Sequence, residues 1–392
     1  MNDFEKLAEL LFPHIDKTPE DYEKIYPERG LSEGARVSRF APSPTGFLHL
    51  GGLFASMVSS LTTKATDDGV FFLRIEDTDD KREVEGAVPV LIDTLGYFGI
   101  KFDEGAMGED ESTTIGIYGP YWQSNRGDIY KACVKYLVEQ GKAYPCFMSE
   151  EEIAQIRADQ ESRKENPGIY GKYAKYRDAS IEEVKKHLDA GEIPVMRFRS
   201  EGDESKYFEV VDGIRGKLSM PENVQDVVIL KQIGLPTYHF AHVVDDHFMR
   251  TTHVVRGEEW LASLPIHVQL FDAMGWEYPV FCHNTVLMKI DEETGQKRKL
   301  SKRKDPELGL SYYKQMGYFP EAVREYLMTI LNSDYEEWRI ANPLTDYNEF
   351  PFAPEKMSNS GTMFDLNKLN DVSKDVLAKK SAEEIYQCCL GW

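Results

Sequence analysis

A glycine pair that follows a proline-rich turn is the first stretch whose residue types could do chemistry. Residues 39–52 read R-F-A-P-S-P-T-G-F-L-H-L-G-G, where the prolines end a short strand and the glycines open an apolar-periodic run. A helix that begins there offers unpaired N–H groups and a partial positive charge, which favour phosphate. His49 would stand at this opening and could donate a hydrogen bond to a reacting phosphate. A loop with a surface histidine before a core helix is the alternative.

A second stretch far downstream is strongly basic. Six of the eight residues from 297 to 304 are lysine or arginine, in the order K-R-K-L-S-K-R-K. Taken alone, such a run would usually be a solvated loop. It becomes a candidate phosphate site because it follows the first stretch in the same chain.

The two stretches in this order resemble the signature pair of class I aminoacyl-tRNA synthetases, with H-L-G-G at 49–52 and K-L-S-K-R at 299–303. The R-F-A-P-S-P-T-G segment, R-I-E-D-T-D at 74–79 and the segment 238–260 narrow the resemblance to glutamyl-tRNA synthetases. The resemblance covers about residues 37–369. It implies activation of L-glutamate with ATP and transfer to the 3′-terminal adenosine of tRNA(Glu).

This reaction needs no protein nucleophile, because the substrate carboxylate attacks the α-phosphorus of ATP and the enzyme positions groups and neutralises charge. The resemblance implies that His49, Lys299 and Lys302 are catalytic. Magnesium is expected to arrive with ATP as a substrate complex. The implied ATP-binding residues are His49, Gly51, Gly52, Glu259, Lys299, Ser301, Lys302 and Arg303.

Glutamate has two carboxylates and one ammonium, so its pocket needs two cationic or strong donor sites and one anion. By the resemblance, Glu76 takes the ammonium and two arginines take the carboxylates, with Arg39 assigned to the side-chain carboxylate. His242 stands where many family members have asparagine. Ordinary strand-end ion pairs are the alternative for the arginines. The implied glutamate-binding residues are Arg39, Ser43, Glu76, Tyr238, His242 and Arg256.

No dedicated metal site is expected. Four carboxylates in residues 76–80 suggest magnesium, but helix-start and turn acids explain the last three equally well. Some members of the family carry a zinc-binding cysteine cluster in the inserted domain, whereas the corresponding stretch 144–148 has one cysteine, which argues against structural zinc. The histidines between 239 and 253 match no zinc spacing.

Composition sets wider bounds. A chain of 392 residues is long enough for two to four units. Its net charge of −21 argues against a broad basic face, although a local basic run can still contact tRNA. Five cysteines without a C-x-x-C pair, no secretory signal and no apolar run of about 18 residues predict a cytoplasmic protein with no membrane segment, expected to be a monomer.

Strand and helix patterns alternate after residue 36, which predicts an α/β fold with a Rossmann-like doubly wound parallel sheet. Strands are expected at 37–40, 70–75, 227–230 and 254–256, with the third returning the chain to this sheet, and a helix is expected over 258–274. The expected units are an N-terminal extension (1–36), the first catalytic half (37–125), an inserted α+β acceptor-end-binding domain (126–224), the second half with the K-L-S-K-R loop (225–305) and a helical stem-contact region (306–392).

Aromatic and basic residues in 170–177 could grip a single-stranded RNA end, or could be an exposed loop with packed tyrosines. The family's anticodon-binding domain is expected to be missing from this chain. Two other functions compete: the related enzyme that glutamylates queuosine in tRNA(Asp), and a non-catalytic tRNA-binding paralogue. The stem-contact-like segment at 358–369 argues against the first, and the retained charged signatures argue against the second.

Overall fold

A five-stranded parallel sheet forms the centre of the computed structural model, which describes residues 2–46, 48–79, 84–291 and 293–390. Its strand order is β10-β9-β1-β2-β3. The strands are β1 (Val37–Phe40), β2 (Val70–Leu73), β3 (Glu104–Gly105), β9 (His253–Gly257) and β10 (Val280–Asn284). The predicted Rossmann-like parallel sheet is thereby confirmed, together with the strands expected at 37–40, 70–75 and 254–256.

Helix α3 (Leu50–Lys64) begins directly after His49 and lies against β1, β2 and β9. Its apolar residues at helical spacing, including Leu53, Phe54 and Leu61, are buried against these strands. This burial explains why the glycine pair opens a helix here despite the low helix propensity of glycine. The predicted unit of strand, loop and helix is confirmed as β1 followed by α3. Helix α4 (Ala87–Tyr97) follows β2.

The expectation for residues 227–230 is wrong. Strand β8 (Val228–Leu230) pairs antiparallel with β5 (Val195–Phe198), which pairs in turn with β4 (Ala143–Cys146). A short apolar run indicates a buried strand but carries no information about its partner. The chain returns to the parallel sheet only after helix α8 (Tyr238–Phe248), through β9, and then adds β10, which the sequence reading did not include.

Residues after 126 form the helices α5 (Gly127–Glu139), α6 (Glu150–Ser162) and α7 (Ile181–Asp189) and a hairpin of β6 (Tyr207–Asp212) and β7 (Gly216–Pro221). The hairpin strand β6 packs against β10 of the parallel sheet. The helix expected over 258–274 divides into a 3-10 turn (Glu258–Ser263) and α9 (Leu264–Met274). Pro265 in the first turn of α9 explains the division, because proline lacks the N–H that a continuing helix would use.

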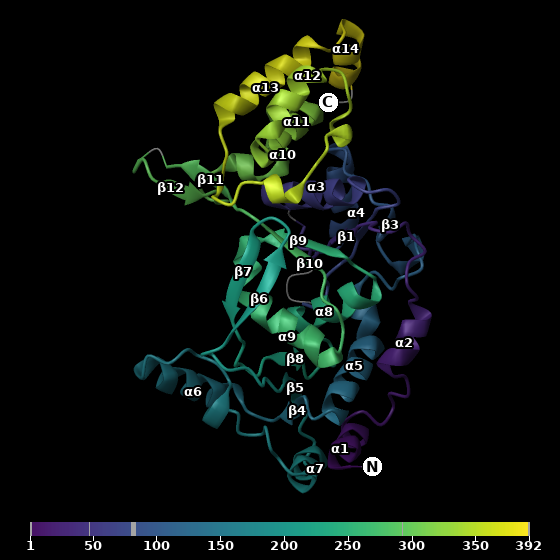
Figure 1. The fold of residues 1–392 in the computed structure, drawn as a ribbon, viewed down its shortest axis with the longest axis vertical. Coiled ribbons are helices and arrows are strands. Elements are labelled where there is room, and N and C mark those ends of the chain that lie inside the picture. The colour runs from purple at the N-terminus through teal and green to yellow at the C-terminus, as the bar shows by residue number, and fades with distance from the viewer. Residues whose placement is uncertain (1, 47, 80–83, 292, 391–392) are drawn as a thin grey trace.

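The two ends of the chain pack on different parts of the molecule (Figure 1). N-terminal helix α1 (Asp3–Leu11) lies against α5, as does α2 (Pro19–Ile25). A small sheet of β11 (Leu287–Ile290), β12 (Lys297–Lys299) and β13 (Thr362–Met363) connects the body to the last helices, which lie at the end opposite α6 and α7. These are α10 (Leu310–Gln315), α11 (Pro320–Leu331), α12 (Asp334–Ala341), α13 (Leu366–Ala378) and α14 (Ala382–Leu390). No helix of the described ranges is long and apolar enough to cross a bilayer.

Candidate active site

A cavity of about 580 Å³ opens at the carboxyl ends of β1, β2, β9 and β10. Ligands gather at this edge of parallel sheets because the loops that follow the strands meet there. The predicted residues that line the cavity are Arg39, Ser43, His49, Gly51, Gly52, Glu76, Tyr238, Arg256, Glu259 and Lys299. His242, Ser301, Lys302 and Arg303 are outside the lining.

His49 is the N-cap of α3, and its Nδ1 accepts a hydrogen bond from the Gly52 N–H at 3.2 Å. Burial lowers the pKa of His49, and the nearby charges of Lys302 and Lys299 lower it further. The ring is therefore neutral at pH 7 with its proton on Nε2. This arrangement places the ring N–H donor of a cavity-lining residue on Nε2.

Two residues of the basic run at 297–304 differ in their contacts, because Arg298 is held by acidic side chains whereas Lys299 lines the cavity. Arg298 donates two hydrogen bonds to Asp305, at 2.6 and 2.8 Å, and a third to Asp291 at 2.8 Å. Asp305 also accepts from the Ser301 N–H at 2.8 Å. Lys299 instead lines the cavity, and in the described ranges it makes no ion pair within 4 Å.

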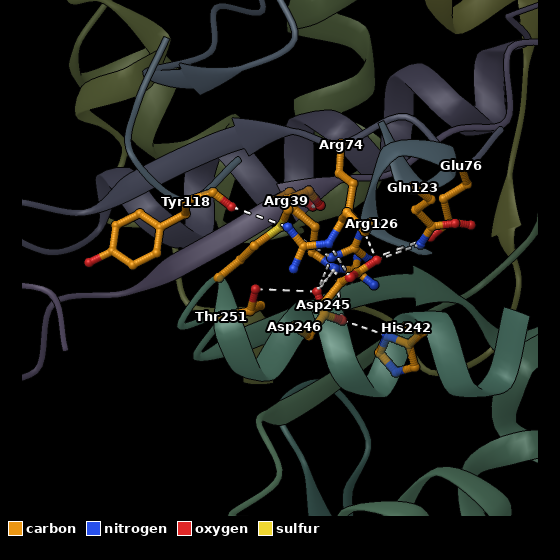
Figure 2. Close-up of polar contacts among 12 residues, drawn as sticks. Arg39, Arg74, Glu76, Tyr118, Gln123, Arg126, His242, Asp245, Asp246 and Thr251 are labelled. Atoms are coloured by element: carbon orange, nitrogen blue, oxygen red, sulfur yellow. Dashed lines mark hydrogen bonds and ion pairs between the residues drawn. The ribbon is translucent and has the colours of Figure 1, made fainter. Parts of the chain in front are cut away.

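Two buried acids of α8, Asp245 and Asp246, hold three arginines that come from separate parts of the chain (Figure 2). Asp246 pairs with Arg39 at 3.0 Å and with Arg74 at 2.7 Å, and Asp245 pairs with Arg126 at 2.6 Å. Burial alone would raise the pKa of Asp246, but Arg39 and Arg74 bring it well below its usual range. Asp246 is thus a charged support for the cavity wall, and Asp245 holds Arg126 beside it.

Glu76 lies in the cavity wall beside these arginines. Arg74 donates to it at 3.4 Å. Burial raises the pKa of Glu76 to about 7, although Arg74 and Arg39 act in the opposite direction. The side chain can therefore gain or lose a proton near neutral pH, and a bound cation would favour its ionised form.

Arg256 differs from Arg39 in its partners. Its Nε donates to His283 and its Nη1 to His267, each at 2.9 Å. Its Nη2 is buried and, as far as the structure describes the chain, has no hydrogen-bond partner. Burial of a donor without an acceptor is costly, so this atom marks a place for a ligand acceptor.

His242 lies behind the cavity wall. Its ring stacks on Tyr238 at 5.9 Å between centroids, and Tyr238 in turn lies 4.2 Å from Trp260. The His242 Nδ1 is 2.5 Å from Asp246 Oδ2, and burial lowers the pKa of His242 to about 3. This histidine therefore supports Tyr238 and Asp246 from within the core and stands apart from the lining residues.

Several lining or supporting residues were missed by sequence reasoning. Trp260 and Asn284 line the cavity, and His267 and His283 hold Arg256. Recognition of a strand at 280–284 would have indicated Asn284, because this polar residue stands at the carboxyl end of that strand. Nothing in the sequence pattern singles out the two histidines.

The described residues contain no cluster of three or more His, Cys, Asp or Glu that could hold a metal ion. In the acid-rich stretch after β2, Asp77 accepts from the Ser124 N–H and hydroxyl at 2.8 and 2.5 Å, which is a structural role. Asp80 of the same stretch lies outside the described residues.

A parallel sheet whose carboxyl edge brings together a glycine-opened helix and a basic loop is the architecture of the class I tRNA synthetases. The chain belongs to the branch of this class described as tRNA synthetases class I (E and Q), whose catalytic-domain model matches residues 36–371. Members of this class use ATP with Mg²⁺ as a substrate complex.

Comparison with individual proteins relates the chain to glutamate--tRNA ligases within this family. The chain is 60% identical over 391 residues to a glutamate--tRNA ligase of Acetivibrio thermocellus, covering 100% of this chain and 70% of that protein. A glutamate--tRNA ligase of Clostridium perfringens is 54% identical over 389 residues, with 99% and 70% covered. A crystal structure of a glutamate tRNA ligase from Elizabethkingia meningosepticum in complex with its amino acid superimposes with a TM-score of 0.78 at 35% identity, covering 90% of this chain and 71% of that one.

Proposed function

We propose that this protein activates L-glutamate with ATP to glutamyl-adenylate and transfers the glutamyl group to the 3′-terminal adenosine of tRNA(Glu). The observation that carries this proposal is one cavity lined by residues of both signatures and by the expected charge set Arg39, Glu76 and Arg256. The relatives' names point to the same reaction, and they favour neither queuosine glutamylation nor a non-catalytic role.

The nucleotide end of the cavity is assigned to ATP. His49, with its proton on Nε2, would donate to the phosphates, and the amides at the start of α3 would add the partial positive charge of a helix N-terminus. Lys299 and Lys302 would stabilise the pyrophosphate as it departs. Magnesium would enter with ATP, held mainly by the phosphates and water.

The amino-acid end is assigned to glutamate. Glu76 would take the ammonium, and Arg39 and Arg256 the two carboxylates, with Arg39 on the side-chain carboxylate. Arg39 shares its charge with Asp246, whereas Arg256 meets only neutral acceptors. Ser43 and Tyr238 would add hydrogen bonds from the lining, and His242 would act through Tyr238 and Asp246.

The remaining units are assigned to tRNA. The inserted unit, which we extend from residue 126 through β8, would receive the acceptor end, and residues 306–392 would contact the stem. We expect the protein to act as a monomer in the cytoplasm, where its tRNA is found. Residues 1–36 brace α5 in this division.

The experiment is to incubate the protein with labelled glutamate, ATP–Mg²⁺ and tRNA(Glu), and to measure label retained on the tRNA. The matched control is the same tRNA without its terminal adenosine, which should accept nothing. Labelling of the shortened tRNA, or of tRNA(Asp) that carries queuosine in place of tRNA(Glu), would contradict the proposed transfer.

A further inference from the structure

We propose that Asp212, His283 and His267 are positioning residues that aim Arg256 at the glutamate carboxylate, so that the inserted hairpin supports the amino-acid pocket. This inference rests on the proposed function. It is carried by a continuous series of hydrogen bonds that begins at the end of β6, passes through β10 and β9, and ends on α9.

The guanidinium of Arg256 is held from two sides. His283 Nε2 accepts from the arginine Nε at 2.9 Å, and His267 Nδ1 lies 2.9 Å from Nη1. The third nitrogen, Nη2, is the buried atom that no described group accepts from, on a residue that lines the cavity. Two sides of a planar group are therefore fixed while the third is left for a ligand.

The tautomers of both histidines follow from these bonds. Arginine can only donate, so His283 Nε2 and His267 Nδ1 must be without a proton. His283 then carries its proton on Nδ1, which lies 2.6 Å from Asp212 Oδ2. His267 carries its proton on Nε2, which lies 3.0 Å from the Nδ1 of His239. Burial lowers the pKa of both His283 and His267, in agreement with neutral rings.

Neutral hydrogen-bond acceptors are suited to position an arginine that binds a substrate carboxylate. A carboxylate such as Asp246, which pairs with Arg39 at 3.0 Å, shares the arginine's charge with the protein. Histidine nitrogens fix the position of Arg256 without adding a negative charge that would compete with the substrate carboxylate. The support thereby keeps the full positive charge for the ligand.

Asp212 is itself locked in place. Its Oδ1 accepts from the N–H groups of Ile214 and Arg215, each at 2.9 Å, in the turn of the β6–β7 hairpin. The Arg215 side chain returns to the carbonyl of His283 at 3.0 Å. Both oxygens accept from the His283 N–H, Oδ1 at 3.3 Å and Oδ2 at 3.2 Å, and Oδ2 also meets the His283 ring. The hairpin thus lies two hydrogen bonds from Arg256.

Amide substitutions separate positioning from simple packing. A glutamine amide reaches the place of a histidine Nε2, and an asparagine amide reaches the place of Nδ1. His283→Gln should therefore keep the acceptor for Arg256, whereas His283→Asn should lose it. At His267 the order inverts, because Arg256 meets Nδ1 there, so His267→Asn should keep the acceptor and His267→Gln should lose it.

The measurement is glutamate-dependent ATP–pyrophosphate exchange by the full chain with tRNA(Glu) present. We expect KM for glutamate to be about 10-fold higher for His283→Asn than for His283→Gln, and about 10-fold higher for His267→Gln than for His267→Asn. KM for ATP should change within about twofold, since the series of bonds does not reach the phosphate side. The matched control is His253, at the amino end of β9, where Asn and Gln should behave alike.

Asp212→Asn supplies a second readout if a histidine variant does not fold. With Oδ1 still bound to the hairpin N–H groups, the new amide N–H₂ would face His283 Nδ1, so the ring would move its proton to Nε2 and lose the bond from Arg256. We expect about a 10-fold higher KM for glutamate with KM for ATP unchanged.

Equal effects of Asn and Gln at both histidines, or an equal rise in KM for ATP, would overturn the positioning roles. An unsubstituted protein that does not activate glutamate would instead overturn the proposed function, and this inference with it. The two failures are thus distinguishable in one assay.

Discussion

Two arginines of the pocket illustrate how a partner sets the role of a side chain. Arg39 is paired with the buried carboxylate of Asp246, and Arg256 is held by two neutral imidazoles. The family resemblance predicted both arginines and Glu76 as pocket residues because they belong to recognisable segments, and all three line the cavity. It could not identify the histidines that hold Arg256, which lie 11 and 27 residues downstream in segments without a motif.

Lys302 tests the assignment of the basic loop. Its charge lowers the pKa of His49, which places it near the end of the cavity that we assign to ATP. Lys302→Ala should lower the rate of glutamate activation by about 100-fold and leave the dissociation constant for glutamate nearly unchanged, because its charge is used as pyrophosphate departs. Single-turnover kinetics and calorimetry measure the two quantities. Lys356→Ala, at an exposed pair with Asp334, is the control. Loss of glutamate binding with an unchanged rate would place Lys302 in the amino-acid pocket.

The affinity for glutamate should depend on pH through the carboxyl group of Glu76. Its pKa is raised to about 7 by burial, and a bound ammonium favours the ionised carboxylate. Glutamate affinity should therefore fall as the pH falls from 8 to 6, because the protein must release a proton to bind. Calorimetry in buffers of different ionisation enthalpy counts this proton. Affinity that is constant over this range would contradict contact between Glu76 and the ammonium.

At the scale of elements, the sequence predicted where strands and helices begin better than it predicted which strands pair. Prolines and the glycine pair located β1 and α3, since their backbone limits act within a few residues. Strand β8 was recognised but joined to the wrong sheet, and the turn at 258–263 was taken as helix. Partner choice depends on which surface each strand buries, which the periodicity of one strand does not contain.

The loop after β12 depends on Asp305, which is almost fully buried and accepts from both Arg298 and the Ser301 N–H. Arg298 holds the pKa of Asp305 below its usual range. Asp305→Asn should loosen the loop and lower the activation rate by about 10-fold, with little change in glutamate binding. Asp334→Asn, which removes only an exposed charge pair, is the matched control for pre-steady-state assays. Equal activation rates for Asp305→Asn and Asp334→Asn would contradict a role of Asp305 in positioning this loop.

At the scale of the whole molecule, buried neutral histidines predict acid sensitivity. Burial lowers the pKa of His242 to about 3 and of His253 to about 4, and also lowers those of His267 and His283. In the unfolded chain these rings take up protons near pH 6.5, so the unfolded state binds more protons below that pH. The free energy of unfolding should therefore decrease as the pH falls from 7 to 5. Urea titrations measure it, and His14, on the exposed surface, supplies a His14→Gln control. A free energy that rises or stays level would contradict neutral buried rings.

The molecule carries a net charge of −21, yet its cavity is lined by two arginines and two lysines beside the three acids Glu76, Asp79 and Glu259. This contrast explains why overall charge was a weaker guide to function than the position of a few cations. The pocket should distinguish substrates by charge, since a neutral amide leaves an arginine without its ionic partner.

The most direct measurement is amino-acid-dependent ATP–pyrophosphate exchange with tRNA(Glu) present, comparing L-glutamate with L-glutamine. We expect exchange with glutamate and a kcat/KM for glutamine lower by about 100-fold or more. Equal exchange with the two amino acids would contradict the charge-matched pocket of Arg39, Glu76 and Arg256.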